Sequence, residues 1–295
     1  MAAKQTAPVV QHLQALARRY PDLEEAAAVY AALLPVVNEA DIRVVPLTLT
    51  PDEARAKLKS GVPLLDGTAL ALDDASARQL LIRLARCLET VPHAADPAST
   101  RAVAARQIRD RLEEGRLEAA VLLQQVGAGD EAGVIAAAEA EHLEPALIWT
   151  LARHALRSAL REWARPWLDL AGNVAWPRSD CLICGASALL GELQGNEAEK
   201  HLRCGQCGAD WPIRRLQCVF CGNDDHRTLR YFYSEDQPSS GRVDVCERCH
   251  GYLKIITTFA PTLFEELLYQ DLATVHLDYM AQAQGYMPGG KAQTG

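Results

Sequence analysis

Four Cys-x-x-Cys pairs in the second half of the chain constrain its fold more than any other feature. Two cysteines at positions i and i+3 of a tight turn direct both sulfurs at one ion, and two such turns complete a tetrahedral four-thiolate site. Four turns therefore predict two metal ions per chain. The pairs are Cys181/Cys184, Cys204/Cys207, Cys218/Cys221 and Cys246/Cys249, with 19, 10 and 24 residues between successive pairs.

The residue after the second cysteine of such a turn commonly has a positive φ, which glycine adopts without strain. Gly185, Gly208 and Gly222 occupy this position in the first three turns. His250 occupies it in the fourth. We therefore expect the fourth turn to depart slightly from the other three.

The spacing of the pairs favours sequential pairing, the first turn with the second and the third with the fourth. This gives loops of 19 and 24 residues, near the spacing of ribbon-type sites, whereas crossed pairing needs longer loops. Each module would hold about 40 residues, too few to fold reliably on an apolar core alone. Metal binding would then supply much of the folding free energy. Both zinc and iron accept four thiolates, so the ligand set leaves the metal open.

The other candidate ligands are better explained without a metal. Cys87 shares a predicted helix face with Leu80 and Leu84 and is interpreted as a small core residue. Three histidines lie near the turns, but eight thiols already complete two sites. We therefore assign none of them as ligands: His201, His226 and His250.

Composition indicates an ordinary globular protein. The chain has 295 residues, 49% of them apolar and 23% charged, and its length suits two domains. Its longest apolar run, Ala26 to Val37, contains Pro35 and is too short to cross a bilayer. The N-terminus lacks the apolar segment of a signal peptide. We expect a cytoplasmic protein without membrane insertion, and in that reducing compartment paired cysteines indicate metal rather than disulfides.

Charge argues against a nucleic-acid-binding protein. The formal net charge is −8, and residues 181–254 carry nine basic against ten acidic side chains. A protein that neutralises many phosphates has the opposite balance. Trp211 and the Arg214-Arg215 pair could form a basic aromatic patch. We favour the interpretation that Trp211 packs against its metal module while the arginines are solvated.

The two halves of the chain differ in periodicity. A capping box at Thr50 and Glu53, with Pro51 between them, predicts a helix start, and Gly61 its end. Extended runs replace helical periodicity after Asn173, and a helix is expected again after Pro261. The other predicted helices are Gln11–Arg19, Asp22–Glu39, Asp73–Thr90, Ser99–Glu114, Arg116–Val126, Glu131–His142 and Glu144–Trp163, and the extended runs are Tyr231–Tyr233, Arg242–Val245 and Tyr252–Thr258.

These patterns predict a mainly α N-terminal domain followed by a small α+β region. That region would contain two four-cysteine modules of the rubredoxin or zinc-ribbon type and a C-terminal helix. The predicted boundaries are 1–172 for the helical domain, 173–217 and 218–258 for the two metal modules, and 259–295 for the C-terminal helix and tail.

The arrangement of the pairs resembles one known family. ADWPIRRLQC lies between the second and third pairs, CHGYLKII begins at the end of the fourth, and Asp271-Leu272-Ala273 follows in a predicted helix. These motifs resemble the formate dehydrogenase accessory protein family, FdhE. The resemblance covers most of residues 175–285. Over the first 170 residues it rests only on the helical sequence pattern and on the length of that region. The chain departs from the family pattern at Leu182 and at Gln270-Asp271.

The resemblance implies a cytoplasmic assembly factor that is not itself an enzyme. It would act on the catalytic subunit of a respiratory, molybdenum-containing formate dehydrogenase before that subunit is exported. The family's rubredoxin-like sites bind iron, so iron is favoured over zinc for the two ions. Matched turn for turn, one site would use Cys181, Cys184, Cys204 and Cys207, and the other Cys218, Cys221, Cys246 and Cys249. The sequence also allows a homo-oligomer.

Two other functions remain open at this point. A nucleic-acid-binding zinc ribbon would show tight, salt-sensitive binding to nucleic acid. A rubredoxin-type electron carrier would require iron with a reversible one-electron couple, which metal analysis and voltammetry would detect.

Overall fold

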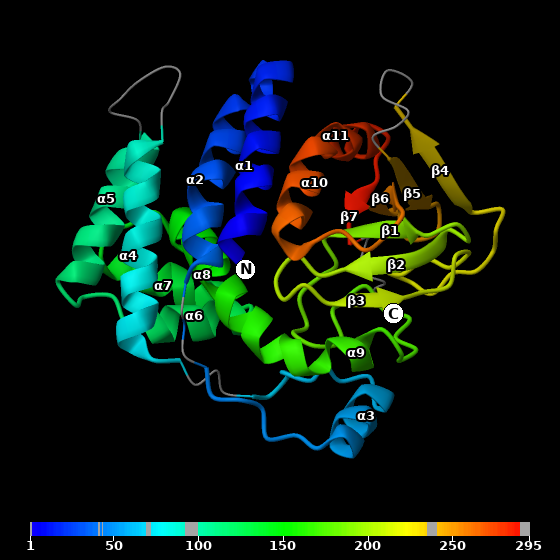
Figure 1. Ribbon diagram of the computed structural model, residues 1–295, viewed down its shortest axis with the longest axis horizontal. Coiled ribbons are helices and arrows are strands. Elements are labelled where there is room, and N and C mark those ends of the chain that lie inside the picture. The colour runs from blue at the N-terminus through cyan, green and yellow to red at the C-terminus, as the bar shows by residue number, and fades with distance from the viewer. Residues whose placement is uncertain are drawn as a thin grey trace. The chain divides into compact units, whose positions relative to one another are not determined.

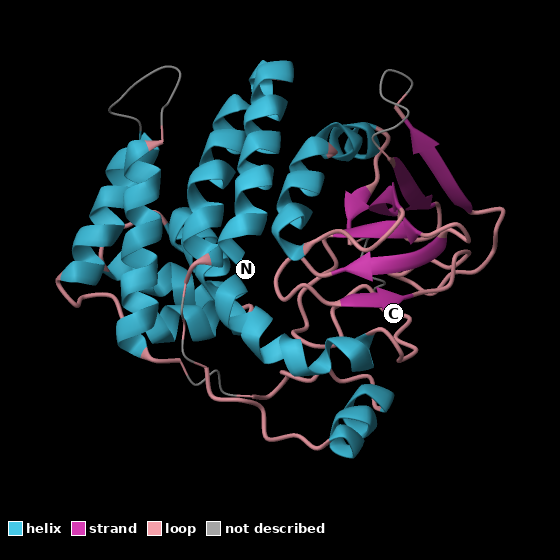
Figure 2. Cartoon of the chain, in the orientation of Figure 1, coloured by secondary structure: helices cyan, strands magenta, loops and turns pink. Residues whose placement is uncertain are grey.

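A computed structural model describes residues 2–40, 42, 44–68, 72–91, 100–234 and 241–289 (Figures 1 and 2). The chain divides into two compact units. The first comprises Met1–Leu47 and Gly67–Trp163, and the second comprises Thr48–Asp66 and Ala164–Gly295. The four regions predicted from the sequence, 1–172, 173–217, 218–258 and 259–295, stay a prediction.

The first unit consists of helices, as predicted, and α4 packs against three of the others, α2, α5 and α6. The first helix begins well before the predicted Gln11, and the helix predicted to begin at Arg116 begins at Ala119. The helices are α1 (Ala2–Arg19), α2 (Glu24–Asn38), α4 (Asp74–Thr90), α5 (Thr100–Glu113), α6 (Ala119–Ala128), α7 (Glu131–Ala140) and α8 (Pro145–Ala164).

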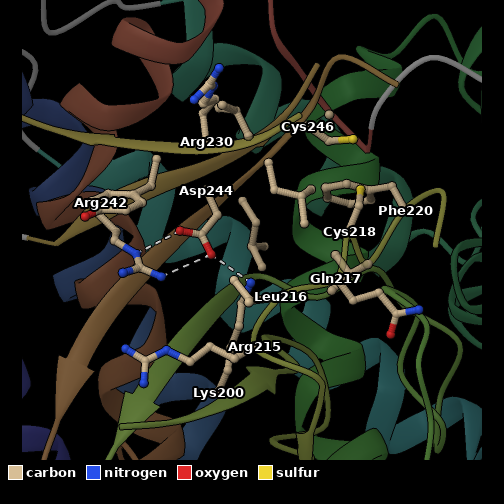
Figure 3. A pocket seen from close by; sticks show the side chains of 16 residues that line it. Lys200, Arg215, Leu216, Gln217, Cys218, Phe220, Arg230, Arg242, Asp244 and Cys246 are labelled. Carbon is tan, nitrogen blue, oxygen red and sulfur yellow. Dashed lines mark hydrogen bonds and ion pairs between the residues drawn. The ribbon is translucent and has the colours of Figure 1, made fainter. Parts of the chain in front are cut away.

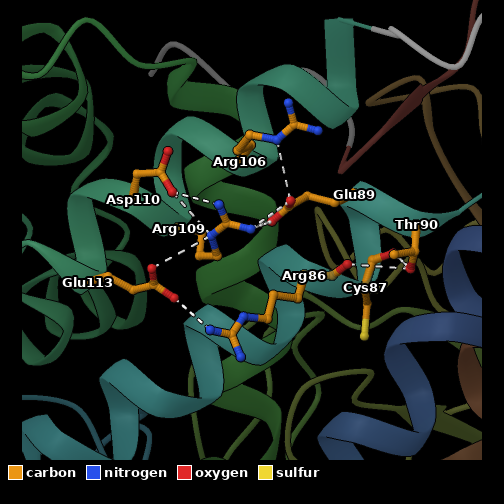
Figure 4. Close-up of polar contacts among 8 residues, drawn as sticks. All are labelled: Arg86, Cys87, Glu89, Thr90, Arg106, Arg109, Asp110 and Glu113. Carbon is orange, nitrogen blue, oxygen red and sulfur yellow. Dashed lines mark hydrogen bonds and ion pairs between the residues drawn. The ribbon is translucent and has the colours of Figure 1, made fainter.

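An ion-pair network joins α4 to α5 (Figure 4). The guanidinium of Arg109 on α5 lies 2.7 Å from both carboxylate oxygens of Glu89 on α4. Arg86 on α4 pairs with Glu113 on α5 at 2.7 Å. The apolar stripe of α4, which includes Leu80 and Leu84, is buried. The two helices are therefore held by an apolar contact with ion pairs along its edge.

The capping box predicted at Thr50 is present, and it begins α3 (Pro51–Lys59). The Thr50 hydroxyl accepts the backbone N–H of Glu53 at 3.3 Å, and the Glu53 carboxylate accepts that of Thr50 at 2.8 Å. These bonds satisfy backbone donors that a helix start leaves free. Although α3 lies among the N-terminal helices in sequence, it belongs to the second unit.

The second unit is built on one sheet, in which six strands follow the order β3-β2-β1-β6-β5-β4 and β7 also pairs with β6. The strands are β1 (Leu190–Gln194), β2 (Glu199–Arg203), β3 (Asp210–Pro212), β4 (Leu229–Tyr233), β5 (Arg242–Cys246), β6 (Gly251–Thr258) and β7 (Met287–Pro288). The extended runs expected at β4, β5 and β6 are confirmed. The sequence did not predict β1, β2 and β3.

Each half of the sheet is an antiparallel triplet that belongs to one cysteine module. The two triplets join through parallel pairing of β1 with β6, where Gly191 lies opposite Ile255. The two modules therefore share one hydrogen-bonded sheet.

Short helices complete this unit, with α11 in contact with β5 and β6 and α9 in contact with β3. They are η2 (Arg165–Trp167), α9 (Leu168–Ala171), η3 (Phe264–Glu266), α10 (Leu267–Ala273) and α11 (Val275–Ala283). Leu277 and Ala281 of α11 pack against Val243 and Val245 of β5. The return to helix expected after Pro261 is confirmed, and the helical segment is divided into α10 and α11 at Thr274, which adopts φ −106° and ψ 13°. Within the described residues, no helix combines the length and apolar character needed to span a membrane.

Candidate metal centres

The eight paired cysteines gather into two groups of four, and within each group the sulfur atoms all lie within 4.8 Å of one another. In the first group, Sγ–Sγ distances are 3.5 Å for Cys181–Cys207 and 3.5 Å for Cys184–Cys204. In the second, they are 3.6 Å for Cys218–Cys249 and 3.8 Å for Cys221–Cys246. The predicted pairing of the first turn with the second, and of the third with the fourth, is confirmed.

All four turns share one backbone hydrogen bond. The residue four positions after the first cysteine donates its N–H to that cysteine's carbonyl, at distances between 2.8 and 3.1 Å. The same residue has a positive φ in every turn. These φ values are 77° at Gly185, 82° at Gly208, 70° at Gly222 and 55° at His250. The fourth turn therefore has the same backbone as the others, and the departure expected there is confined to residue type.

The geometry of each group fits a tetrahedral metal ion. A metal–sulfur distance of about 2.3 Å places the four sulfurs of a tetrahedron about 3.8 Å apart. The closest sulfur pairs of the two groups lie at 3.5 to 3.8 Å. Among the described residues, each group contains cysteine alone. Four thiolates suit zinc or iron. In both groups the cysteines are free, and no sulfur pair lies at the length of a disulfide bond.

Burial and sulfur hydrogen bonds set the protonation of the first group. Burial raises the pKa of Cys181 and Cys207 well above the ordinary thiol value. The pKa of Cys204 is instead well below it, because Cys181, Cys184 and Cys207 direct hydrogen bonds to its sulfur. The backbone N–H groups of Gln206 and Cys207 also donate to this sulfur, each at 3.4 Å. A cation that binds here must therefore displace protons from the buried thiols.

The second group has a comparable division. Burial raises the pKa of Cys218, and it raises that of Cys249 to about 11. Burial also acts to raise the pKa of Cys246, but hydrogen bonds, first from the Cys249 backbone and then from the Asn223 side chain, lower it overall. The Asn223 amide lies 3.5 Å from the Cys246 sulfur. One sulfur in each group is thus prepared to carry negative charge.

Asn223 is a site residue that the sequence interpretation missed. Its side chain is buried, and its amide nitrogen also donates to the Thr228 hydroxyl at 2.8 Å. Its backbone carbonyl accepts the backbone N–H of Cys218 at 2.8 Å. The position directly after the Cys-x-x-Cys-Gly turn was the available signal, since a polar side chain there lies close to the sulfurs.

The two groups differ in what covers them. The segment after α3 lies against the first group, where the backbone N–H groups of Leu64 and Leu65 donate to the carbonyls of Leu182 and Ile183, both at 2.9 Å. All four of these side chains are buried. Two sulfur-bearing residues of the second group, Cys218 and Cys246, instead line a surface pocket. The first group is therefore enclosed by an additional segment of chain, and the second borders solvent.

The remaining candidates lie outside both groups. Trp211 is fully buried and its ring N–H donates to the Arg178 carbonyl, while Arg214 and Arg215 are exposed. The packing interpretation of Trp211 is confirmed, and its ring cannot stack on a nucleic-acid base. Cys87 is half-buried on α4, and burial raises its pKa. The three histidines are absent from the two groups formed by the described residues: His201, which bonds Asp210 at 2.6 Å, His226 and His250.

Comparison with known proteins identifies similar sequences and a similar fold. Residues 216–293 match the family model "FdhE, C-terminal domain". An FdhE homologue from Aquifex aeolicus is 33% identical over 115 residues, which is 38% of this chain and 40% of that protein. One from Stutzerimonas stutzeri is 32% identical over 153 residues, covering 50% of this chain and 48% of that protein. The aligned region thus spans less than half the length of these curated relatives.

The structural match extends further along the chain. The crystal structure of the FdhE protein from Pseudomonas aeruginosa matches with a TM-score of 0.60 and 23% sequence identity. It covers 95% of this chain and 91% of that one. The helical region and the cysteine-bearing sheet therefore share a fold with that protein.

Proposed function

We propose that this chain, which resembles the FdhE family in the sequence of its C-terminal part and in its fold, is an assembly factor for a respiratory, molybdenum-containing formate dehydrogenase. In this proposal it binds the catalytic subunit in the cytoplasm and does not itself catalyse a reaction. The observation that carries the proposal is the pair of all-cysteine groups within one sheet, in a chain whose C-terminal part matches the FdhE family model.

The eight cysteines of the two groups are the proposed metal ligands. Bound metal would join the turns of each module, and iron would in addition supply a one-electron couple. Iron is favoured by the family resemblance, and zinc is compatible with the same thiolates. Because free thiols persist only in a reducing compartment, the proposal places the chain in the cytoplasm.

The protein's own residues would hold the turns ready for the ion. The left-handed residue after each second cysteine fixes the turn, and N–H donors to Cys204 and Cys246 stabilise thiolate before metal arrives. The shared sheet couples the two sites, because β1 from one module pairs with β6 from the other. Loss of one ion would therefore disturb strands that position the other module.

Deletion of the gene, followed by complementation, tests this function. We expect the deletion strain to lose formate dehydrogenase activity while still synthesising the catalytic subunit, and the intact gene to restore it. Affinity-tagged chain purified without oxygen should carry two metal ions and retain the catalytic subunit. Normal maturation in the deletion strain would refute the assignment, whereas normal metal content with no captured subunit would refute the partner alone.

A further inference from the structure

A basic pocket lies beside the second cysteine group and is lined by residues of β2, β4, β5 and β6 and of the connection between β3 and β4 (Figure 3). Its volume is ≈ 80 Å³. Four of its lining side chains are cationic, and Asp244 is the acidic one among them. The cations come from separate segments: Lys200 on β2, Arg215 in the connection after β3, Arg230 on β4 and Arg242 on β5. The chain as a whole has a net charge of −8, so this concentration of positive charge is local.

One carboxylate serves two of these cations. The Lys200 ammonium lies 2.7 Å from Asp244 Oδ2, and the Arg242 Nε lies 2.8 Å from Asp244 Oδ1. Figure 3 shows both side chains directed at this carboxylate from different sides. A single negative charge cannot neutralise both, so this partly buried cluster retains a positive charge.

Because Lys200 is buried, the excess positive charge of this cluster is energetically unfavourable. The Lys200 side chain is only 4% exposed. An ammonium has three N–H donors, and Asp244 is the one acceptor it reaches among the described residues. Burial of a cation with incomplete partners is unfavourable unless further acceptors complete its shell. An incoming group with two or more oxygens would supply them.

Arg215 adds a cation without an ion-pair partner in the described part of the chain. Its side chain is exposed, and Figure 3 shows its guanidinium extending to the same side of the pocket as that of Arg242. The Arg242 guanidinium is itself oriented by the Tyr231 ring, whose centroid lies 4.7 Å from Cζ. Arg230 lies at the rim and pairs with the exposed Glu247 at 3.1 Å.

We propose that this pocket binds an oxyanion, a carboxylate or phosphate group, held by Lys200, Arg215 and Arg242. The planar donor fork of arginine matches the paired oxygens of such groups. The ligand would be either a small free anion or an acidic side chain of a bound polypeptide. Because Cys218 and Cys246 also line the pocket, the oxyanion would lie next to the second metal site. This inference stands independently of formate dehydrogenase assembly.

Calorimetric titration of the zinc-loaded full chain tests the proposal in three separate arms. The probes are inorganic phosphate, glutarate and a short peptide with two adjacent glutamates. We expect saturable one-to-one binding in at least one arm. Binding of phosphate or glutarate would identify a small anion as the ligand, and binding of the peptide alone would identify an acidic side chain.

Two neighbouring arginines provide the matched comparison. Arg215→Gln should weaken binding roughly tenfold, as expected for loss of a charge-assisted contact. Arg214→Gln makes the same charge change at an exposed residue outside the pocket lining and should leave the affinity unchanged. Lys200→Met should weaken binding more strongly, with metal content measured alongside to verify folding. Equal weakening by the two arginine variants, or no saturable binding in any arm, would overturn the proposal.

Discussion

Glu192 of β1 and Arg203 of β2 form a buried ion pair, with 2.8 Å between Oε1 and Nη1. Their side chains are 0% and 4% exposed. The other Arg203 amino group donates to the Thr262 carbonyl at 2.8 Å, and the Thr262 N–H donates back to Glu192 at 3.3 Å. The pair therefore fastens the segment before η3 to the sheet of the first cysteine module.

Replacing Glu192 by alanine should destabilise the second unit by about 3–5 kcal/mol, because it leaves the Arg203 guanidinium buried without its carboxylate. Denaturant unfolding of the metal-loaded chain measures the effect. The comparison is Arg230→Ala, which breaks the exposed pair with Glu247 in the same unit and should cost at most about 1 kcal/mol. If both variants lost a similar amount of unfolding free energy, the buried ion pair would contribute no more to stability than the exposed one.

The turn glycines allow backbone strain to be separated from packing. Gly222 has a φ of 70° and no atom within 4 Å of a built Cβ. Gly222→Ala should therefore cost about 1–2 kcal/mol, the penalty of the left-handed conformation. Gly208 has a φ of 82°, but its Cβ would lie 2.8 Å from the Phe264 ring. Gly208→Ala should cost more.

Unfolding free energies at full metal occupancy measure both glycine variants. Equal costs would mean that the Phe264 ring moves aside without penalty. His250→Gly is the reverse change, because it removes a side chain from a residue already at φ 55°. It should not weaken metal binding at the fourth turn.

Features encoded by neighbouring residues could be predicted from the sequence. The four cysteine turns and the Thr50–Glu53 capping box are local patterns, and both are present. Loop length alone indicated which turns combine. The helices of the first unit followed from apolar periodicity, since that unit buries leucine and alanine stripes.

Features that depend on distant contacts could not be predicted. β1 and β2 escaped recognition because Glu192, Lys200 and Arg203 are buried charges that interrupt the alternation of a half-buried strand. The parallel pairing of β1 with β6 joins segments about 60 residues apart and leaves no local mark. The contact of Leu64 with Leu182 is longer-range still.

The first unit should lose stability in acid because of His154. Burial, followed by the nearby charges of Arg157 and Arg153, lowers the pKa of this histidine to about 3. In the unfolded chain its pKa is about 6.5. Between about pH 6.5 and pH 3, His154 therefore binds a proton in the unfolded state but not in the folded state. Stability is complete above about pH 6.5 and declines by up to about 1.4 kcal/mol per pH unit as pH falls toward 3.

Thermal unfolding of the first unit between pH 7 and 4 measures this decline. His154→Leu cannot bind the proton, so its decline should be shallower, whereas exposed His12→Gln should follow the parent chain. Parallel curves for the parent and the His154 variant would show that other groups govern the acid limb. Metal loss at low pH affects the cysteine groups, so the readout must report the helical unit.

The second cysteine group should be required for the proposed assembly function. Replacing Cys218 and Cys221 by serine removes two of its four thiolates, and we expect about half the parent metal content. Loss of the ion should destabilise β4 and β5, the two strands that lie between the third and fourth cysteine turns. Phe232 of β4 packs inward, whereas Tyr231 and Tyr233 are 60% and 54% exposed. Residues 235–240, between β4 and β5, lie outside the described residues.

Capture of the formate dehydrogenase catalytic subunit, measured alongside metal content, decides the role of this group. The double variant should lose the second ion, capture less subunit and fail to restore enzyme activity. Cys87→Ser removes a thiol outside both groups and should change none of these. A reactive-thiol mechanism predicts a different pattern, in which the variant keeps its metal and partner but loses activity. If the second ion is lost and formate dehydrogenase still matures normally, the third and fourth turns are not the working part of this protein.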